Sequence, residues 1–125
     1  MKGACHMSKI PKAIGPYSTY RETTDLIFVS GQLPINGNTG NIESEDFSDQ
    51  IKQVMENMSL ILKETGKTFD QIVKTTCFLT DLNHFGILNE VYGSYFNDEF
   101  PARSAFEVSK LPKDALVEIE FIIQK

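Results

Sequence analysis

The sequence ALVEIEFIIQ, residues 115–124, alternates its side chains with the period of a β-strand. One face of this strand is wholly apolar and carries Val117, Ile119, Phe121 and Ile123. The opposite face mixes two aliphatic side chains with two carboxylates: Leu116, Ile122, Glu118 and Glu120. The apolar face must be covered by other elements. The mixed face fits a partly polar subunit interface better than a bare surface.

A long amphipathic helix is available to cover the apolar face. Its apolar residues recur at helical spacing and form one stripe: Phe47, Ile51, Val54, Met55, Met58, Ile61 and Leu62. Ser44 is the expected N-cap of this helix and Gly66 its expected C-terminal stop. A second helix is expected from Asn83, as its N-cap, through about Asp98.

The remaining β-rich segments complete one sheet. Four further strands are expected, at residues 17–21, 25–32, 72–80 and 103–109. The order β-β-α-β-α-β-β predicts a single α+β domain over residues 9–125, with two helices on one face of the sheet. Residues 1–8 are expected to be a disordered end or an expression remnant.

Composition narrows the classes of function. The chain has 125 residues, with 12 basic and 17 acidic side chains and a formal net charge of −5. The basic residues are dispersed, which argues against a general nucleic-acid binder. No apolar stretch approaches the roughly 20 residues of a membrane span, and no signal peptide is evident, so a cytoplasmic protein is expected. Cys5–His6 has no second Cys/His pair at metal-ligand spacing, and Cys77 is expected to be buried in a strand.

Two charged residues lie in otherwise strand-like segments. Arg103, one of only two arginines, follows Pro101, and Glu118 lies in the last strand. Charges in such places are costly unless they are paired or functional. Taken alone, an ion pair between Arg103 and a carboxylate, within the sheet or between subunits, is the simpler interpretation. Tyr17, Ser30 and Asn89 likewise have plain structural interpretations.

The combination of motifs favours a functional interpretation. The blocks AIGPYS, VSGQLP, DQIVKTTCFLTDLNHF and PARSAFEVSKLPKDALVEIE begin at residues 13, 29, 70 and 101. In this order and spacing they resemble the RidA/YjgF family of reactive-intermediate deaminases, over nearly the whole chain from about residue 9. The last block is highly specific to that family.

The resemblance implies a fold, an assembly and an activity. The subunit would be chorismate-mutase-like, and three subunits would form a trimeric barrel with pockets at their interfaces. The activity would be hydrolysis of 2-imino or 2-enamino acids, such as 2-iminobutanoate and 2-iminopropanoate, to 2-keto acids and ammonia. No cofactor and no metal are implied.

The resemblance also assigns residues to the site. Arg103 matches the arginine that binds the substrate carboxylate, and Glu118 matches the residue that orients or activates water. The positions that match the substrate-binding pocket are Tyr17, Ser30, Gly31, Asn89 and Ala105. Ala105 departs from the family, because relatives often have Cys or Thr there; only its backbone N–H is left to contact a ligand.

Two alternative functions remain open at this point. The same arginine-lined pocket would serve a regulator that senses a keto acid or amino acid without turnover. Members of the family are also described as translation inhibitors or endoribonucleases. The net negative charge and the lack of a histidine pair make RNA cleavage the weakest of the three hypotheses.

Overall fold

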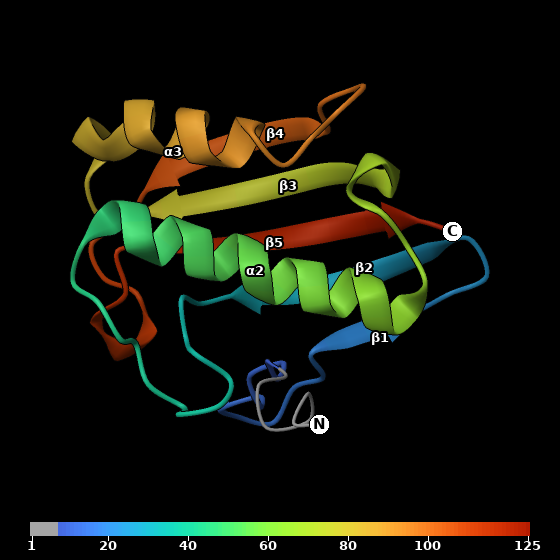
Figure 1. Cartoon of the computed structure of the whole chain (residues 1–125), viewed down its shortest axis with the longest axis horizontal. Helices are drawn as coiled ribbons and strands as arrows, with labels where there is room; N and C mark the ends of the chain where they lie inside the picture. The colour runs from blue at the N-terminus through green and yellow to red at the C-terminus, as the bar shows by residue number, and fades with distance from the viewer. Residues whose placement is uncertain (1–7) are drawn as a thin grey trace.

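The computed structural model describes residues 8–125, and the expectations for Met1–Met7, including Cys5–His6, lie outside the described residues. Five strands form one sheet in the order β1-β2-β5-β3-β4 (Figure 1). Their bounds are Tyr20–Glu22 (β1), Leu26–Gln32 (β2), Ile72–Leu79 (β3), Ala102–Glu107 (β4) and Val117–Gln124 (β5). The helices are α2, Phe47–Thr65, and α3, Phe85–Gly93. The predicted α+β class, with five strands and two helices, is confirmed.

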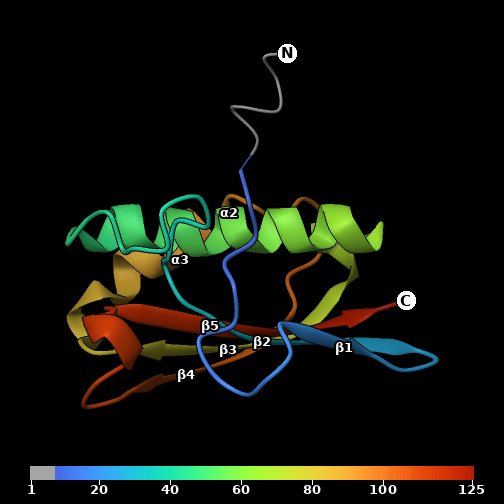
Figure 2. The same cartoon turned by 90° about the horizontal axis from the view of Figure 1, so that it is seen from below.

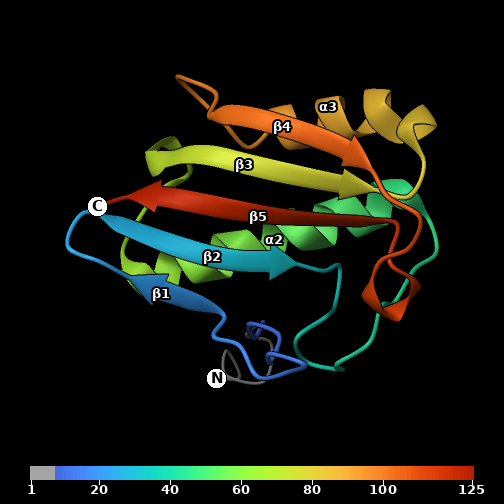
Figure 3. The ribbon, with the colours of Figure 1, turned by 180° about the vertical axis from the view of Figure 1, so that it is seen from behind.

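The two helices lie on the same side of the sheet. Figure 2 shows α2 and α3 in one layer and the five strands in the other. Viewed from behind, in Figure 3, the strands lie in front and no helix covers them. We call this uncovered side the open face. β3 and β4 are parallel and are joined through α3, whereas the other neighbouring strands are antiparallel. No helix within residues 8–125 is long and apolar enough to cross a membrane.

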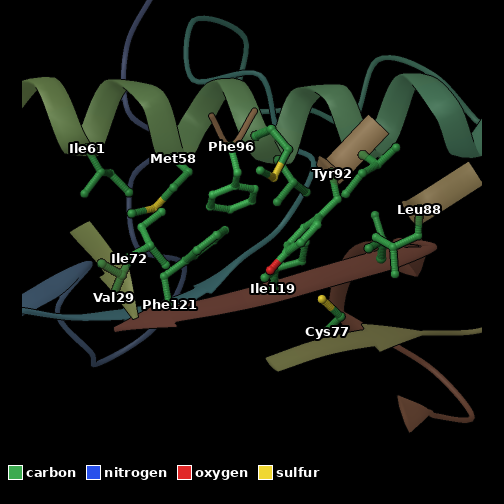
Figure 4. Packing of buried hydrophobic residues seen from close by; sticks show 14 of the residues in the cluster. Val29, Met58, Ile61, Ile72, Cys77, Leu88, Tyr92, Phe96, Ile119 and Phe121 are labelled. Atoms are coloured by element: carbon green, nitrogen blue, oxygen red, sulfur yellow. The ribbon is translucent and has the colours of Figure 1, made fainter. Parts of the chain in front are cut away.

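The core lies between α2 and the central strand β5. The apolar face predicted for β5 is buried, with Val117, Ile119, Phe121 and Ile123 at most 1% exposed. The apolar stripe of α2 packs against it in the same cluster. Figure 4 shows Met58 and Ile61 descending from α2 toward Phe121. Cys77, predicted to be a buried strand thiol, is buried and free, and burial raises its pKa to about 11.

The ends of α2 differ in part from the prediction. Asp46, not Ser44, is the N-cap: its carboxylate accepts a hydrogen bond from the Asp49 backbone N–H at 3.0 Å. Ser44 donates its hydroxyl to the Asp49 side chain instead, at 2.9 Å. Serine and aspartate both cap helices, and here the carboxylate of Asp46 reaches the first turn. Gly66 ends the helix as predicted, with a left-handed φ of 73°.

The second helix is shorter than predicted. The chain first forms a 3₁₀ turn at Leu82–His84 whose N-cap is Asp81, not Asn83, and α3 then ends at Gly93 rather than near Asp98. The Ser94 hydroxyl donates to the Val91 carbonyl at 2.6 Å, where the helix stops. The predicted helix was too long because Phe96 follows the apolar spacing of the helix. Phe96 is indeed buried, but it lies after the end of α3.

Strands β1, β4 and β5 are shifted by up to three residues from their predicted bounds. β1 begins at Tyr20 rather than Tyr17, because the preceding segment turns across β2, where the Ser30 hydroxyl donates to the Ser18 carbonyl at 2.6 Å. β4 covers Ala102–Glu107. β5 begins at Val117, because Ala115 ends a 3₁₀ turn at Pro112–Asp114.

We expect Asn57→Ala to destabilise the fold. The wholly buried Asn57 amide donates to the carbonyls of Leu33 and Ile35, at 3.1 and 2.9 Å, and so ties the chain after β2 to α2. Loss of two buried hydrogen bonds is expected to lower the free energy of unfolding by about 2 kcal/mol. Urea denaturation at equal protein concentrations measures this change. Gln53→Ala, which removes only the 2.9 Å bond to the Asn57 oxygen, is the control and is expected to cost clearly less.

Candidate functional site

Arg103 lies on edge strand β4 and faces the helix layer. It is in register with Thr75 of β3, whose wholly buried hydroxyl shares a 2.8 Å hydrogen bond with the Tyr92 hydroxyl of α3. The central guanidinium carbon lies 5.2 Å from the centre of the Tyr92 ring and 5.1 Å from that of Phe85. Two aromatic faces therefore hold the cation from the α3 side.

No carboxylate neutralises this cation within the described part of the chain. Among residues 8–125 the ion pairs are Lys110–Asp114 and Lys125–Glu22, and Arg103 takes part in neither. The ion pair within the sheet, the simpler interpretation of the sequence, is therefore not formed in this chain. A half-buried guanidinium with its planar fork of donors left free is suited to bind a carboxylate through two parallel hydrogen bonds.

A pocket of about 330 Å³ opens beside Arg103. It lies between α3 and the start of β4 and is lined by Asn89, Tyr92, Gly93, Phe100, Pro101 and Arg103. The structure thus brings together two of the residues predicted for the site, Arg103 and Asn89. Ala105 lies two residues further along β4 on the same side, in register with Cys77, and packs against the core.

The aromatic partners of Arg103, Phe85 and Tyr92, were not predicted from the sequence. Phe85, Asn89 and Tyr92 follow one another at intervals of four and three residues in α3. Such spacing places them on one face of a helix. That signal was present in the sequence, but it did not reveal that this face meets Arg103.

Glu118 lies on the open face of β5. It is half-buried, and its neighbours Val117 and Ile119 point into the core on the other side. Its carboxylate crosses Gly31 of β2 so closely that a Cβ on Gly31 would overlap it. The φ of Gly31 is not in the left-handed region, so a Cβ here would displace the Glu118 side chain rather than strain the backbone.

A bulge in β2 creates this close approach. Val29 pairs with Phe121 and Gln32 pairs with Ile119, so both Ser30 and Gly31 lie opposite Glu120 alone. Such an extra residue re-aims the side chains of the bulged strand and is common beside active sites. Here it places Gly31 next to Glu118.

The environment of Glu118 favours its protonated form. Burial raises the pKa of its carboxyl group above the usual value, and the nearby charge of Glu120 raises it further. Both glutamates lie on the same face of β5, two residues apart. A carboxyl group with a raised pKa is better suited to accept and return a proton near neutral pH than an ordinary glutamate.

Ser30 and Tyr17 border a second pocket of about 510 Å³ on the open face. Glu120 and Arg21, the second of the two arginines, also line this pocket, so Arg21 lies near two predicted site residues. The Ser30 hydroxyl is already engaged with the Ser18 carbonyl. The Tyr17 side chain is 45% exposed and its hydroxyl accepts a hydrogen bond from the Ile14 backbone N–H at 3.3 Å.

The predicted site residues therefore form two groups on opposite faces of the sheet. Arg103, with Asn89 and Ala105, belongs to the helix side of β4. Glu118, with Gly31 and its neighbours, belongs to the open face. β3 separates β5 from β4, so the two strands are roughly 9–10 Å apart, in addition to the thickness of the sheet. A small substrate cannot contact both Arg103 and Glu118 of one chain.

The structure is thus an α+β protein with an arginine that has no carboxylate partner among residues 8–125 on one face of the sheet, and a half-buried carboxylate beside a β-bulge on the other. A family model described as Endoribonuclease L-PSP matches residues 7–125. The chain belongs to this family, the RidA/YjgF family.

Relatives and solved structures agree with this assignment. A RutC family protein of Pyrococcus abyssi is 50% identical, over 94% of this chain and 92% of its own length. The human 2-iminobutanoate/2-iminopropanoate deaminase is 42% identical, over 92% of this chain and 84% of its own. The crystal structure of RidA from an Antarctic Psychrobacter matches with a TM-score of 0.90 at 38% identity, covering 94% of both chains.

Proposed function

We propose that the protein hydrolyses 2-imino and 2-enamino acids, such as 2-iminobutanoate and 2-iminopropanoate, to 2-keto acids and ammonia. The observation that carries the proposal is the free guanidinium of Arg103, held between two aromatic rings at the edge of a pocket. The human relative bears the name of this activity. The reaction would take place in the cytoplasm, without a cofactor.

Arg103 would bind the substrate carboxylate. Its fork of donors matches the two carboxylate oxygens, and the Phe85 and Tyr92 rings limit the access of water to one side of the ion pair. With the carboxylate fixed, the adjacent C=N carbon lies at a set distance from the guanidinium. Positioning of this kind lowers the barrier because the reactants no longer have to find each other.

Glu118 would activate the attacking water. The carboxylate takes a proton from the water while the oxygen adds to the carbon of the protonated imine, and a carbinolamine forms. Glu118 then gives this proton to the nitrogen. The C–N bond breaks as the carbinol hydroxyl passes its proton back to the Glu118 carboxylate and becomes the keto C=O, and ammonia leaves and takes up that proton. Tyr17, Ser30, Gly31, Asn89 and Ala105 would complete the lining of the site.

A second copy of the chain would join the two groups. We propose a homotrimer with the chorismate-mutase-like barrel arrangement, in which Arg103 of one subunit meets Glu118 of the next. The open face supports this assembly, since it carries Phe28 and Phe106, which are 44% and 53% exposed, next to the mixed face of β5. Exposed aromatic side chains on an uncovered sheet favour burial against another chain.

The activity is tested by coupling the purified protein to a threonine dehydratase, which releases an imine. We expect keto-acid formation to accelerate in proportion to the added protein.

The two alternative functions predict other results. A protein that binds 2-ketobutyrate without accelerating its formation would be a sensor, and the deaminase proposal would then be wrong. A ribonuclease-free preparation that cleaves RNA, but not in the Arg103→Ala variant, would support the endoribonuclease alternative instead.

The shared site is tested by mixing two inactive variants. Arg103→Ala subunits keep Glu118, and Glu118→Gln subunits keep Arg103, so mixed trimers re-create intact sites at some interfaces. Unfolding and refolding equal amounts together is expected to recover about a quarter of the wild-type activity, because random assembly pairs the two intact halves at that frequency. Sites contained within single chains would recover none.

Gly31→Ala is expected to reduce turnover by about tenfold or more without unfolding the protein. The added methyl group would displace the Glu118 carboxylate, whereas the backbone conformation suits alanine. The measurement is kcat and KM in the coupled assay. Gly86→Ala is the control, because a Cβ there meets nothing within 4 Å. Equal kcat values for wild type and Gly31→Ala would show that turnover does not depend on the position of Glu118 against Gly31.

A further inference from the structure

In a single chain the pocket beside Arg103 has a volume of about 330 Å³. This is the lower end of the roughly 300–1,000 Å³ typical of ligand sites, and it leaves room beside a three- or four-carbon substrate. Beyond the Arg103 guanidinium and the Asn89 amide, the lining is apolar and consists of the Tyr92 ring, Phe100, Pro101 and the backbone at Gly93. A ligand held by its carboxylate at Arg103 would therefore have apolar surroundings for its side chain.

Gly93 keeps this pocket open. It is the last residue of α3, where glycine is less favourable than alanine, and its φ is not in the left-handed region. The backbone conformation thus does not require glycine. A Cβ built there would lie 3.8 Å from the Phe100 ring, so a larger side chain would extend into the space between α3 and Phe100.

Phe100 forms the opposite wall. Its ring packs edge-to-face on the buried Phe96, with centroids 6.1 Å apart, and remains 67% exposed. One side of the ring is anchored by the core, and the rest is free to contact a ligand. An exposed aromatic surface beside an anion-binding arginine is suited to an apolar group that follows a carboxylate.

We propose that Gly93 and Phe100 determine the specificity of the pocket, which accepts the side chains of 2-imino acids that are larger than ethyl and apolar, branched or aromatic. This inference rests on the proposed function, because it takes Arg103 as the carboxylate clamp. Gly93 supplies the room, and Phe100 supplies the apolar contact. Every methylene buried there contributes to binding, by about fourfold in affinity at most.

Calorimetric titration with stable 2-keto acids tests the proposal. The probes are pyruvate, 2-ketobutyrate, 4-methyl-2-oxopentanoate and phenylpyruvate. We expect the wild-type protein to bind the last two at least about tenfold more tightly than pyruvate. Gly93→Leu is expected to remove this preference while the affinity for pyruvate changes less than about twofold. Glu90→Leu, an exposed change on the same helix away from the pocket, is the control.

Phe100→Ala provides a second test, which removes an apolar contact instead of filling the pocket as Gly93→Leu does. It is expected to weaken phenylpyruvate binding by about fivefold or more and to leave pyruvate binding nearly unchanged. Equal affinities of the wild type for all four keto acids would overturn the inference, as would a Gly93→Leu variant that weakens all four alike. In both cases the proposed function stands, since small keto acids still bind. Failure of every keto acid to bind would instead overturn the proposed function.

Discussion

Arg103→Ala is expected to lower kcat/KM for 2-iminobutanoate by about 100-fold or more, with most of the loss in KM. A bidentate, charge-assisted carboxylate contact contributes about 3 kcal/mol, which corresponds to this factor. Nothing else in the pocket of residues 8–125 replaces the cation, because its remaining lining is neutral. Steady-state kinetics in the dehydratase-coupled assay give both constants.

Two further variants sharpen the interpretation of this loss. Arg103→Lys keeps the charge but not the planar fork, so we expect it to recover only a small part of the activity. Lys110→Ala removes a cation from an exposed surface ion pair with Asp114 and is expected to leave kcat/KM unchanged. If Arg103→Ala retained more than about half of the wild-type kcat/KM, the carboxylate clamp would have to lie elsewhere.

The sequence predicted the elements that bury a continuous apolar face. β5 and α2 were identified because their periodicities of two and 3.6 residues are uninterrupted. The predicted start of α2 was wrong because Ser44 and Asp46 are both of residue types that cap helices, and Asp46 is the N-cap. The predicted end of α3 was wrong for a different reason. Phe96 continues the apolar spacing, but it lies in the segment after the helix, which also packs on the core.

The site was predictable by residue but not by geometry. The face of Glu118 follows from the alternation of β5, whereas β4 carries no such pattern: its burial does not alternate along Ala102–Glu107. The sequence therefore could not place Arg103 on the opposite face from Glu118. The close approach of Glu118 to Gly31 could not be predicted either, because the Ser30–Gly31 bulge depends on how β2 pairs with β5.

Glu118→Gln is expected to reduce kcat by about 100- to 1,000-fold, since proton transfer by a positioned side chain contributes this much. Binding of 2-ketobutyrate should persist, because Arg103 is untouched and the substituted side chain keeps its shape. Calorimetry of the variant checks binding, and the coupled assay checks turnover. Loss of binding together with turnover would indicate a structural role for Glu118 rather than an acid–base role.

The pH dependence of the wild-type protein should report the same group. Glu118 acts as a base only when ionised, and burial and Glu120 raise its pKa, so kcat is expected to fall on acidification at a higher pH than an ordinary glutamate would give. Glu120→Gln removes the neighbouring negative charge but leaves the burial, the first cause of the shift. The acid limb of its pH profile should therefore move toward lower pH while remaining above the ordinary glutamate range. An acid limb that does not move in Glu120→Gln would mean that another group sets it, because the charge of Glu120 acts on Glu118 along the same strand face.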